Sequence, residues 1–262
     1  MTRRVDGPTP LLWMLFSLGL LFLVAPLLIV VPLSFTEARY FRFPPPGYSL
    51  IWYETFFTDV QWWGSVITSA KLAAAVAVVA TAIGTLAAYG LVRGRPRGRK
   101  LIIAWLLSPI IVPAIVSAIS LYGLYATIGL IGSFWGLLAA HTIIATPFVV
   151  ICVVAALQRF DPVYERASLS LGAGPFRTFV RVTLPNVLPG VASGALLAFM
   201  HSFDEVVLVL FIGGNILTLP RKLWNEIIFM VEPTQASASV MLILASLCVM
   251  TLWLLLQPRD QR

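Results

Sequence analysis

Six long runs of apolar residues divide this 262-residue chain, and the stretches between them hold most of its charged residues. A helix needs about 20 apolar residues, at about 1.5 Å per residue, to cross the ~30 Å hydrocarbon core of a bilayer. Each of the six runs is long enough to do so. We therefore predict six transmembrane helices, over residues 11–33, 66–92, 101–128, 134–157, 187–212 and 238–256.

The pattern within these runs favours helices over strands. Membrane-spanning strands would alternate apolar and polar residues over about ten positions, whereas these runs are apolar on every face. The first run exceeds the apolar part of a secretory signal, and no A-x-A-like cleavage site follows it before Ser34 and Phe35. We therefore predict an all-α membrane protein with a single transmembrane domain over residues 1–262, and we interpret the first run as a retained span.

Composition supports this interpretation. Hydrophobic residues make up 59% of the chain and charged residues 11%, with a mean hydropathy of +0.93. Soluble domains average about 45–50% apolar and about 25% charged residues. Eighteen Lys and Arg with eleven Asp and Glu are too few to cover a water-soluble surface. The numbers exclude a disordered chain and an ordinary cytosolic protein.

The orientation of the chain follows from its basic residues, because Lys and Arg in short loops stay on the cytoplasmic side. With six spans, the two tails and the second and fourth connections lie on the same side of the membrane. Five of the 18 basic residues fall on the opposite side. The side that holds the tails has the remaining 13, namely Arg3, Arg4, Arg93, Arg95, Arg97, Arg99, Lys100, Arg159, Arg166, Arg177, Arg181, Arg259 and Arg262. We predict that both termini are cytoplasmic.

The net charge of +7 has the same explanation. Basic clusters such as RGRPRGRK, residues 93–100, mark the cytoplasmic side and contact anionic lipid headgroups, so they do not indicate a nucleic-acid partner. Cys152 and Cys248 both lie inside predicted spans and lack the spacing of a metal site or a disulfide framework.

The fourth connection, residues 158–188, is long enough to carry structure of its own. Asp161 is suited to cap a helix and Pro162 to begin it, which predicts a short helix from Pro162 to about Leu171. Gly172 then supplies a left-handed stop. The Gly-Pro pair at 174 and 175 begins a second short helix, predicted to end near Leu184 and Pro185.

The first of these short helices is predicted to form a small docking knob. Val163, Ala167 and Leu171 repeat at four-residue spacing as one apolar stripe, with Glu165, Arg166 and Ser168 beside it as a polar rim. Such a feature contributes little to holding a helical bundle together. It is well suited to docking a soluble partner.

At these residues the chain resembles the membrane-spanning subunits of bacterial ATP-binding-cassette importers with the type I, methionine-permease-like fold. The family signature is E-A-A, four residues, G-A, about nine residues, then hydrophobic-x-L-P. Aligned on Gly172 and Ala173, the sequence has Arg166, Ala167 and Ser168 at E-A-A, with Glu165 one place early, and ends V-T-L-P at Leu184 and Pro185. A shift of one residue turns a helical side chain by about 100°.

The resemblance extends over nearly the whole chain and narrows the subfamily. The segments PPPGYSLIWYETFF, SVITSAKLA, SFDEVVLVLFIGG, TLPRKLW and EPTQASAS resemble the smaller permease subunit of spermidine/putrescine-type importers. Thr68 replaces the asparagine expected before Ser69. The same subfamily serves iron(III), thiosulfate and phosphonate-like substrates, so the alternative is the same machinery with another cargo.

The resemblance implies a place in a larger complex in the bacterial inner membrane. Two permease subunits form the pore, the second being a different chain, and a periplasmic binding protein delivers the substrate. Two ATPase subunits grip the loop between the fourth and fifth spans and bind the ATP. The residues implied in coupling are Glu165, Arg166, Ala167, Ser168, Gly172, Ala173, Leu184 and Pro185.

The clearest chemical anomaly inside a predicted span is FMHSFDEVVL in the fifth. A carboxylate at mid-bilayer costs at least ~2.5–3.5 kcal/mol, so such groups face a cavity or a partner. One hypothesis is that Asp204 or Glu205 lines the translocation path with His201, Ser202 and Phe203 and offsets a cationic substrate. The other is that a carboxylate bonds a neighbouring helix and sets the packing. Metal binding is a third possibility, although a further ligand is missing.

Other polar groups in the spans have simpler interpretations. His141 stands alone in the fourth span and is interpreted as a hydrogen-bonding partner of a neighbouring helix. Pro109, Pro113 and Pro147 fall inside spans, where proline kinks a helix and frees backbone carbonyls.

No catalytic site can be assembled from the sequence. It contains neither the G-x-S-x-G nor the H-E-x-x-H pattern, and it lacks the G-x-x-x-x-G-K-[ST] loop that cradles nucleotide phosphates. We therefore expect no enzymatic activity and no cofactor in this chain. A secondary transporter, the alternative from another class, would show inverted repeats and ion-coupling residues near the membrane midplane.

Overall fold

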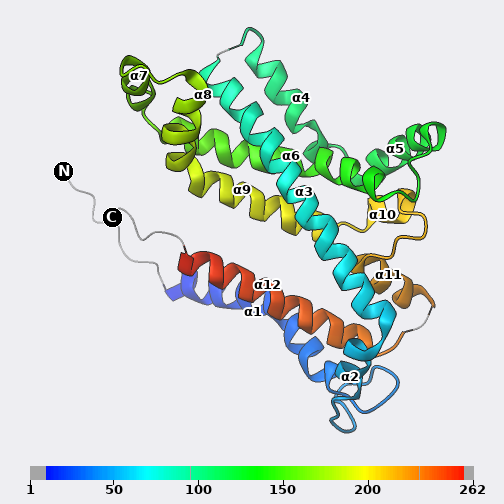
Figure 1. The fold of residues 1–262 in the computed structure, drawn as a ribbon. Helices are drawn as coiled ribbons and strands as arrows, with labels where there is room; N and C mark the ends of the chain where they lie inside the picture. Colours follow the sequence, from blue (N-terminus) through cyan, green and yellow to red (C-terminus); the bar gives the residue numbers. More distant parts are fainter. Residues whose placement is uncertain (1–9, 95, 230, 257–262) are drawn as a thin grey trace. The chain divides into compact units, whose positions relative to one another are not determined.

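A computed structural model describes residues 10–94, 96–229 and 231–256, and every regular element within these ranges is a helix (Figure 1). Their only β-type pairing is an isolated bridge between Thr36 and Tyr48. The all-α prediction is confirmed for this part of the chain. The elements are α1 (Pro10–Ser34), α2 (Ile51–Thr58), α3 (Val60–Arg93), α4 (Arg99–Ile111), α5 (Ala114–Ile128), α6 (Phe134–Arg159), α7 (Val163–Ser170), α8 (Pro175–Thr178), the π-helix η1 (Phe179–Thr183), α9 (Leu184–Asp204), α10 (Val207–Ile212), α11 (Leu219–Phe229) and α12 (Thr234–Leu256).

Four described helices are long and apolar enough to cross a membrane on their own: α1, α3, α6 and the continuous helical stretch Pro175–Asp204. The bent pair α4 and α5 would supply a fifth crossing. The sixth predicted run coincides with α12, whose described apolar part, Thr234–Cys248, is shorter than a full crossing. The count of six and the cytoplasmic termini stay predictions. Arg3, Arg4, Arg95, Arg259 and Arg262 lie outside the described residues.

The third predicted span is wrong as a single helix. The chain bends by 99° between α4 and α5, at Val112 and Pro113. Val112 is extended, with φ −73° and ψ 127°, because the ring of a following proline disfavours the helical conformation. Pro113 has no N–H with which to continue the ladder of α4. The predicted proline kink is therefore a complete break.

The fifth predicted span is also interrupted. Helix α9 ends at Asp204 rather than at residue 212, and Glu205 is extended with ψ 114°. The short helix α10 then begins at Val207, and the Glu205 carboxylate accepts a hydrogen bond from the Leu208 N–H at 3.0 Å. Glu205 thus satisfies one of the free N–H groups at the start of α10.

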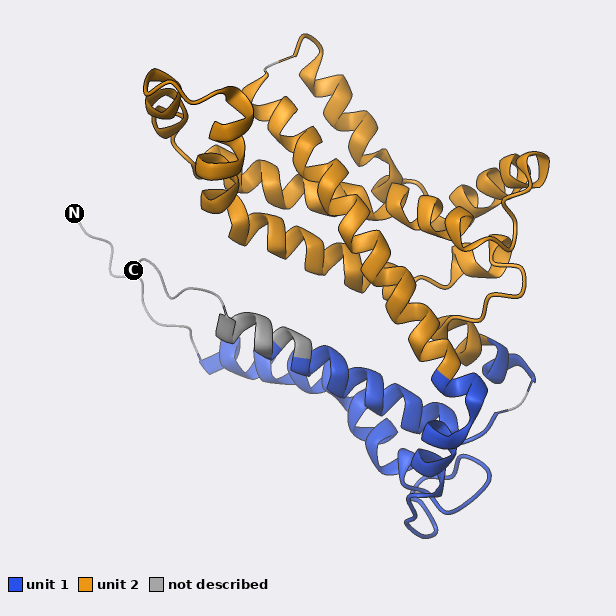
Figure 2. Ribbon diagram, in the orientation of Figure 1, with its two compact units in different colours: residues 1–63, 225–262 blue, residues 64–224 orange. Residues whose placement is uncertain are grey.

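The chain divides into two compact units (Figure 2). Unit 1 contains Met1–Trp63 and Asn225–Arg262, and unit 2 contains Gly64–Trp224. In unit 1, α12 packs on α1, and the Ser237 hydroxyl donates to the carbonyl of Ser34 at 3.1 Å. Large side chains of α1 such as Phe22 and Leu23 are 79% and 71% exposed, which suits lipid or a partner helix and not water.

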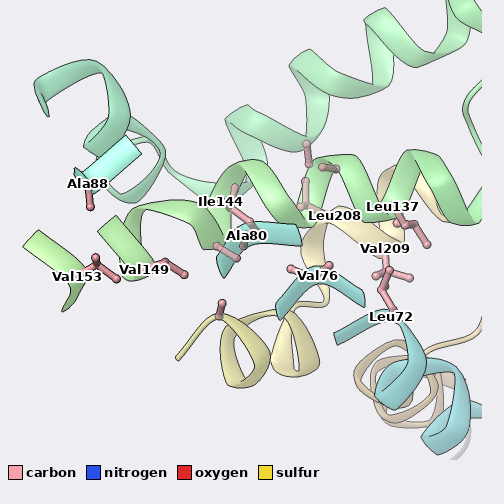
Figure 3. Packing of buried hydrophobic residues seen from close by; sticks show 14 of the residues in the cluster. Leu72, Val76, Ala80, Ala88, Leu137, Ile144, Val149, Val153, Leu208 and Val209 are labelled. Carbon is pink, nitrogen blue, oxygen red and sulfur yellow. The ribbon is translucent and has the colours of Figure 1, made fainter. Parts of the chain in front are cut away.

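The core of unit 2 forms around α6 (Figure 3). Leu72, Val76 and Ala80 of α3 belong to one buried cluster with side chains of α6 and with Leu208 and Val209 of α10. Two glycines allow α3 and α9 to approach Val149 of α6 closely. A Cβ at Gly84 of α3 would lie 2.7 Å from the Val149 Cβ, and a Cβ at Gly194 of α9 would lie 2.9 Å from its Cα. Membrane helices often pack through such small residues.

Replacing Gly84 tests this packing. We expect Gly84→Ala to destabilise the purified protein by about 1–3 kcal/mol, because the new methyl group overpacks the contact with Val149. The measurement is the thermal unfolding midpoint in detergent. Gly90→Ala in the same helix is the matched control, since its added Cβ would meet nothing within 4 Å beyond its own stretch of helix and alanine is the better helix former. Equal midpoints for the two variants would contradict the packing model.

Candidate functional site

The loop after α6 folds into a short helix close to the predicted position. Helix α7 begins at Val163, one residue later than expected, with Pro162 at the cap position. The Asp161 carboxylate accepts a hydrogen bond from the Val163 N–H at 2.8 Å. Asp161 therefore still pairs with one of the free N–H groups at the start of the helix. The helix ends with Leu171 as its C-cap, and Gly172 has φ +85°. The predicted left-handed glycine stop is confirmed.

The second short helix does not end near Leu184 and Pro185 as predicted. It runs from Pro175 through η1 into α9 without a break. Pro185 lies in the first turn of α9, where its missing N–H would leave a carbonyl unpaired in an uninterrupted α-helix. In the wider π turn the Leu184 N–H bonds to the carbonyl of Phe179, five residues back. Single π turns often occur at functional sites.

Glu165 is the centre of a buried polar cluster that joins three elements. Its Oε2 forms an ion pair with Nε of Arg93, the last residue of α3, at 2.7 Å. Its Oε1 accepts a hydrogen bond from the Thr183 hydroxyl of η1, also at 2.7 Å. Glu165 is only 8% exposed. The prediction that it belongs to an exposed polar rim is therefore wrong, because this pairing turns the side chain inward.

Arg93 extends the same cluster to the end of α6. Its Nη2 donates to the carbonyl of Phe160 at 3.1 Å, and its guanidinium lies 5.8 Å from the centre of the Phe160 ring. The Phe160 ring stacks on Tyr164 of α7, with centroids 5.8 Å apart. A buried carboxylate requires a paired charge and hydrogen bonds, and here the partners come from α3 and η1. We call Arg93, Phe160, Glu165 and Thr183 the Glu165 clamp.

The clamp leaves the apolar stripe of α7 exposed. Val163, Ala167 and Leu171 all face away from the protein, Leu171 being 89% exposed. Arg166 is exposed, and Ser168 lies with its hydroxyl 3.0 Å from that of Thr178 in α8. The other residues implied in coupling are Gly172 and Pro185, which are exposed, and Ala173 and Leu184, which are half-buried.

A second site lies where α9 ends. His201 and Glu205 line a cavity of about 260 Å³ with residues 109–114 and Ser117 of the α4–α5 break and with Ile144 and Phe148 of α6. The His201 and Phe148 rings lie 4.8 Å apart. Asp204 is exposed and does not line the cavity. Of the three titratable groups predicted to share one turn, His201 and Glu205 therefore line one cavity, and Asp204, at the end of α9, does not.

Ser202 and Phe203 contact neighbouring side chains instead of the cavity. The Ser202 hydroxyl lies 2.9 Å from Nδ1 of the fully buried His141. The predicted interhelical role of His141 is confirmed, because this contact joins α6 to α9. Phe203 stacks on Phe199, with ring centroids 5.8 Å apart.

The cavity lining combines mostly apolar side chains with the Glu205 carboxylate and a helix end. Glu205 supplies a carboxylate, and α4 directs its C-terminal end at the cavity through residues 109–111. The last carbonyls of a helix lack intrahelical donors and carry partial negative charge, and Pro113 cannot donate to the carbonyl of Pro109. Such surroundings favour a cation. Among the described residues, no group of three His, Cys, Asp or Glu side chains gathers to hold a metal ion.

Several residues of these sites carry no functional signal in the sequence. Arg93 carried only a topological signal as part of a basic cluster, and Thr183 was an unmarked position before Leu184. The α4–α5 break was signalled by Pro113, although its 99° bend was not. Nothing in the sequence pairs Glu165 with Arg93, which lies 72 residues earlier in the chain.

Comparison with known sequences gives consistent matches. Residues 80–261 match a family described as binding-protein-dependent transport system inner membrane component. The chain is 33% identical over 232 residues to the spermidine/putrescine transport system permease protein PotC of Haemophilus influenzae, covering 88% of this chain and 90% of the relative. It is 33% identical over 226 residues to the putrescine transport system permease protein PotI of Escherichia coli, covering 82% and 79%.

Two solved structures share the fold. A bacterial ABC transporter that imports the acidic polysaccharide alginate superposes with a TM-score of 0.70 at 15% identity, covering 95% of this chain and 94% of that chain. An amino acid ABC transporter with histidines gives a TM-score of 0.60 at 18% identity, covering 80% and 97%.

A double-mutant cycle tests the Glu165 clamp. We expect Glu165→Gln to destabilise the protein by roughly 3 kcal/mol, because it leaves the Arg93 charge partly buried without its ion pair. Arg93→Met should cost a similar amount, and the double variant less than the sum of the two. Thermal unfolding in detergent measures all three. Arg97→Gln, at an exposed site in the loop between α3 and α4, is the control. If the losses of stability in the two single variants add up to the loss in the double variant, Glu165 and Arg93 are not coupled.

Proposed function

The chain belongs to the family of binding-protein-dependent transport system inner membrane components, and on this premise we propose that it is the permease subunit of an ATP-driven importer. It forms half of a translocation pore in the bacterial inner membrane, and a second permease, encoded as a different chain, forms the other half. Both termini and α7 face the cytoplasm. The ATP is bound by partner subunits and not by this chain.

The Glu165 clamp is the single observation that carries this proposal. Exposed apolar side chains such as Val163 and Leu171 mark a surface that a partner covers, and α7 is attached by one carboxylate to both α3 and the start of α9. A displacement of α7 is therefore transmitted to two membrane helices at once. We propose that each of two ATPase subunits grips one such helix and that ATP-driven closure turns the pore outward.

Substrate chemistry is the second part of the proposal. The name of PotC contains spermidine and putrescine and that of PotI contains putrescine, and the cavity is lined by the Glu205 carboxylate and the C-terminal end of α4. A protonated amine is stabilised in such surroundings, whereas thiosulfate or a phosphonate would be repelled. We propose a polyamine as the substrate, delivered by a periplasmic binding protein. Iron(III) is the cationic alternative, and a secondary transporter the alternative from another class.

Reconstitution tests the class of transporter. This chain, the second permease, the ATPase and the binding protein are placed in proteoliposomes, and uptake of labelled spermidine and putrescine is measured with and without ATP. We expect uptake only when both ATP and the ATPase are present. Uptake that persists without the ATPase would contradict the importer and favour a secondary transporter.

The cavity carboxylate gives a sharper prediction. Glu205→Gln should raise the KM for spermidine about tenfold, equivalent to about 1.4 kcal/mol, because a carboxylate that offsets an ammonium group becomes neutral. The amide oxygen can still accept the hydrogen bond from Leu208, so assembly and ATPase activity should survive. Glu54→Gln, on the exposed face of α2, is the matched control. Loss of assembled complex with Glu205→Gln would indicate a packing role instead.

A further inference from the structure

A cavity of about 520 Å³ lies between the last turns of α6 and the first turns of α9. It shares no lining residue with the cavity beside Glu205. Gly190 of α9 allows the two helices to cross closely here, because a Cβ at this position would lie 2.5 Å from the Ala156 Cβ. Figure 1 shows that this end of both helices lies beside α8. We call this space the α6–α9 cavity.

The α6–α9 cavity changes from cationic to apolar along its length. Arg159, the last residue of α6, and Asn186, in the first turn of α9, are exposed at one end. Cys152 and Ser193 lie seven residues further into the two helices, which is about 10 Å at about 1.5 Å per residue. Alanine, proline and glycine residues line the wall between the two ends. The cavity thus has a charged mouth and a small-residue apolar interior.

The positive charge at the mouth is available to an anion. Within the described chain Arg159 forms no ion pair, and none of the described lining residues is acidic. The nearby Asp161 carboxylate already accepts the hydrogen bond from the Val163 N–H. The end of α6 would itself repel an anion through its free carbonyls. That repulsion is reduced here, because the Phe160 carbonyl accepts a hydrogen bond from Arg93 at 3.1 Å.

We propose that the α6–α9 cavity binds one anionic phospholipid, with the phosphate at Arg159 and an acyl chain along the apolar wall. Helix α6 is long and apolar enough to cross a membrane. Its last residue therefore lies at the level of the lipid headgroups, on whichever side the helix ends. Arginine binds phosphate through two parallel N–H···O bonds, and basic pockets between membrane helices bind anionic headgroups.

Asn186 adds a second donor at the mouth. Its amide nitrogen donates one hydrogen bond to the Val182 carbonyl at 2.7 Å, and an amide group carries two donors. The remaining N–H is available to a phosphate oxygen. Arg159 and Asn186 come from different helices, so a bound headgroup bridges α6 and α9 and stabilises their crossing.

The shape of the cavity favours a lipid over the other ligands of the same membrane. Inorganic phosphate shares the headgroup chemistry, but it would occupy the mouth and leave the apolar interior empty. A protonated polyamine would meet the positive charge of Arg159 and be repelled. A phospholipid has the same order as the cavity, with its charge at the membrane surface and its apolar chain further in.

The test titrates the purified full-length chain in detergent with dioleoyl phosphatidylglycerol, with phosphatidylcholine of the same chains and with inorganic phosphate. Native mass spectrometry counts the bound lipid, and the thermal unfolding midpoint reports binding because a ligand of the folded state raises it. We expect one phosphatidylglycerol per chain, bound at least about tenfold more tightly than phosphatidylcholine. Arg159→Gln should remove this preference, because the loss of a hydrogen bond to a charged group weakens binding about tenfold or more.

Matched variants separate the headgroup from the acyl chain. Ser193→Leu fills the inner end of the cavity and should weaken phosphatidylglycerol binding about tenfold, because the acyl chain loses buried area. Ser193→Ala should leave binding unchanged, since this hydroxyl donates only to the Pro189 carbonyl of its own helix. Arg97→Gln, at an exposed site outside the cavity, is the control for Arg159→Gln and should retain the lipid.

Three outcomes would overturn the lipid site. Equal binding of phosphatidylglycerol and phosphatidylcholine would show that the charge is not recognised. Inorganic phosphate that raises the midpoint as much as phosphatidylglycerol, with no effect of Ser193→Leu, would make a free ion the ligand. Loss of the bound lipid when the second permease joins the chain would show that the partner subunit covers the cavity. ATP-dependent uptake in proteoliposomes tests the proposed function separately, so the two can fail independently.

Discussion

The pairing of one buried carboxylate organises the end of unit 2. Glu165 joins Arg93 at the end of α3 to Thr183 in η1, and Arg93 reaches the carbonyl of Phe160 at the end of α6. Because a carboxylate in low dielectric is stable only when its charge and its hydrogen bonds are matched, these contacts fix α7 against three other helical segments. The same pairing removes an acid from the exposed surface. The burial of Glu165 therefore determines both the position of α7 and its surface charge.

The second constraint is the need to satisfy backbone groups where helices break. Irregular backbone at membrane depth is tolerated when it is buried in protein or lines a cavity. The α4–α5 break at Pro113 and the α9–α10 break at Glu205 both border one cavity. Glu205 bonds to the start of α10 and also faces this cavity. The two hypotheses, that the carboxylate sets the packing and that it lines the translocation path, are therefore compatible at Glu205.

The sequence predicted most of the helical content, and the misses have physical reasons. Apolar runs identify helices because lipid leaves the backbone no other partner than its own carbonyls. The ends are harder to predict. Helix α9 ends at Asp204 although no proline or glycine is nearby. The Glu205 carboxylate accepts the hydrogen bond from the Leu208 N–H that the carbonyl of Asp204 would accept in a continued helix. Conversely, Pro185 suggested an end where η1 shifts the hydrogen-bond register by one residue and allows the helix to continue.

The sequence by itself determined that lipid surrounds most of this protein, that a short helix ends at a glycine, and that two carboxylates lie in an apolar run. These are properties of composition and of neighbouring residues, and local physics decides them. Only the tertiary structure decided that Glu165 faces inward and that Glu205 and not Asp204 lines the cavity. Both outcomes depend on partners distant in sequence, Arg93 for one and the α4–α5 break for the other. A buried charge takes its role from the groups that surround it, and folding alone brings those groups together.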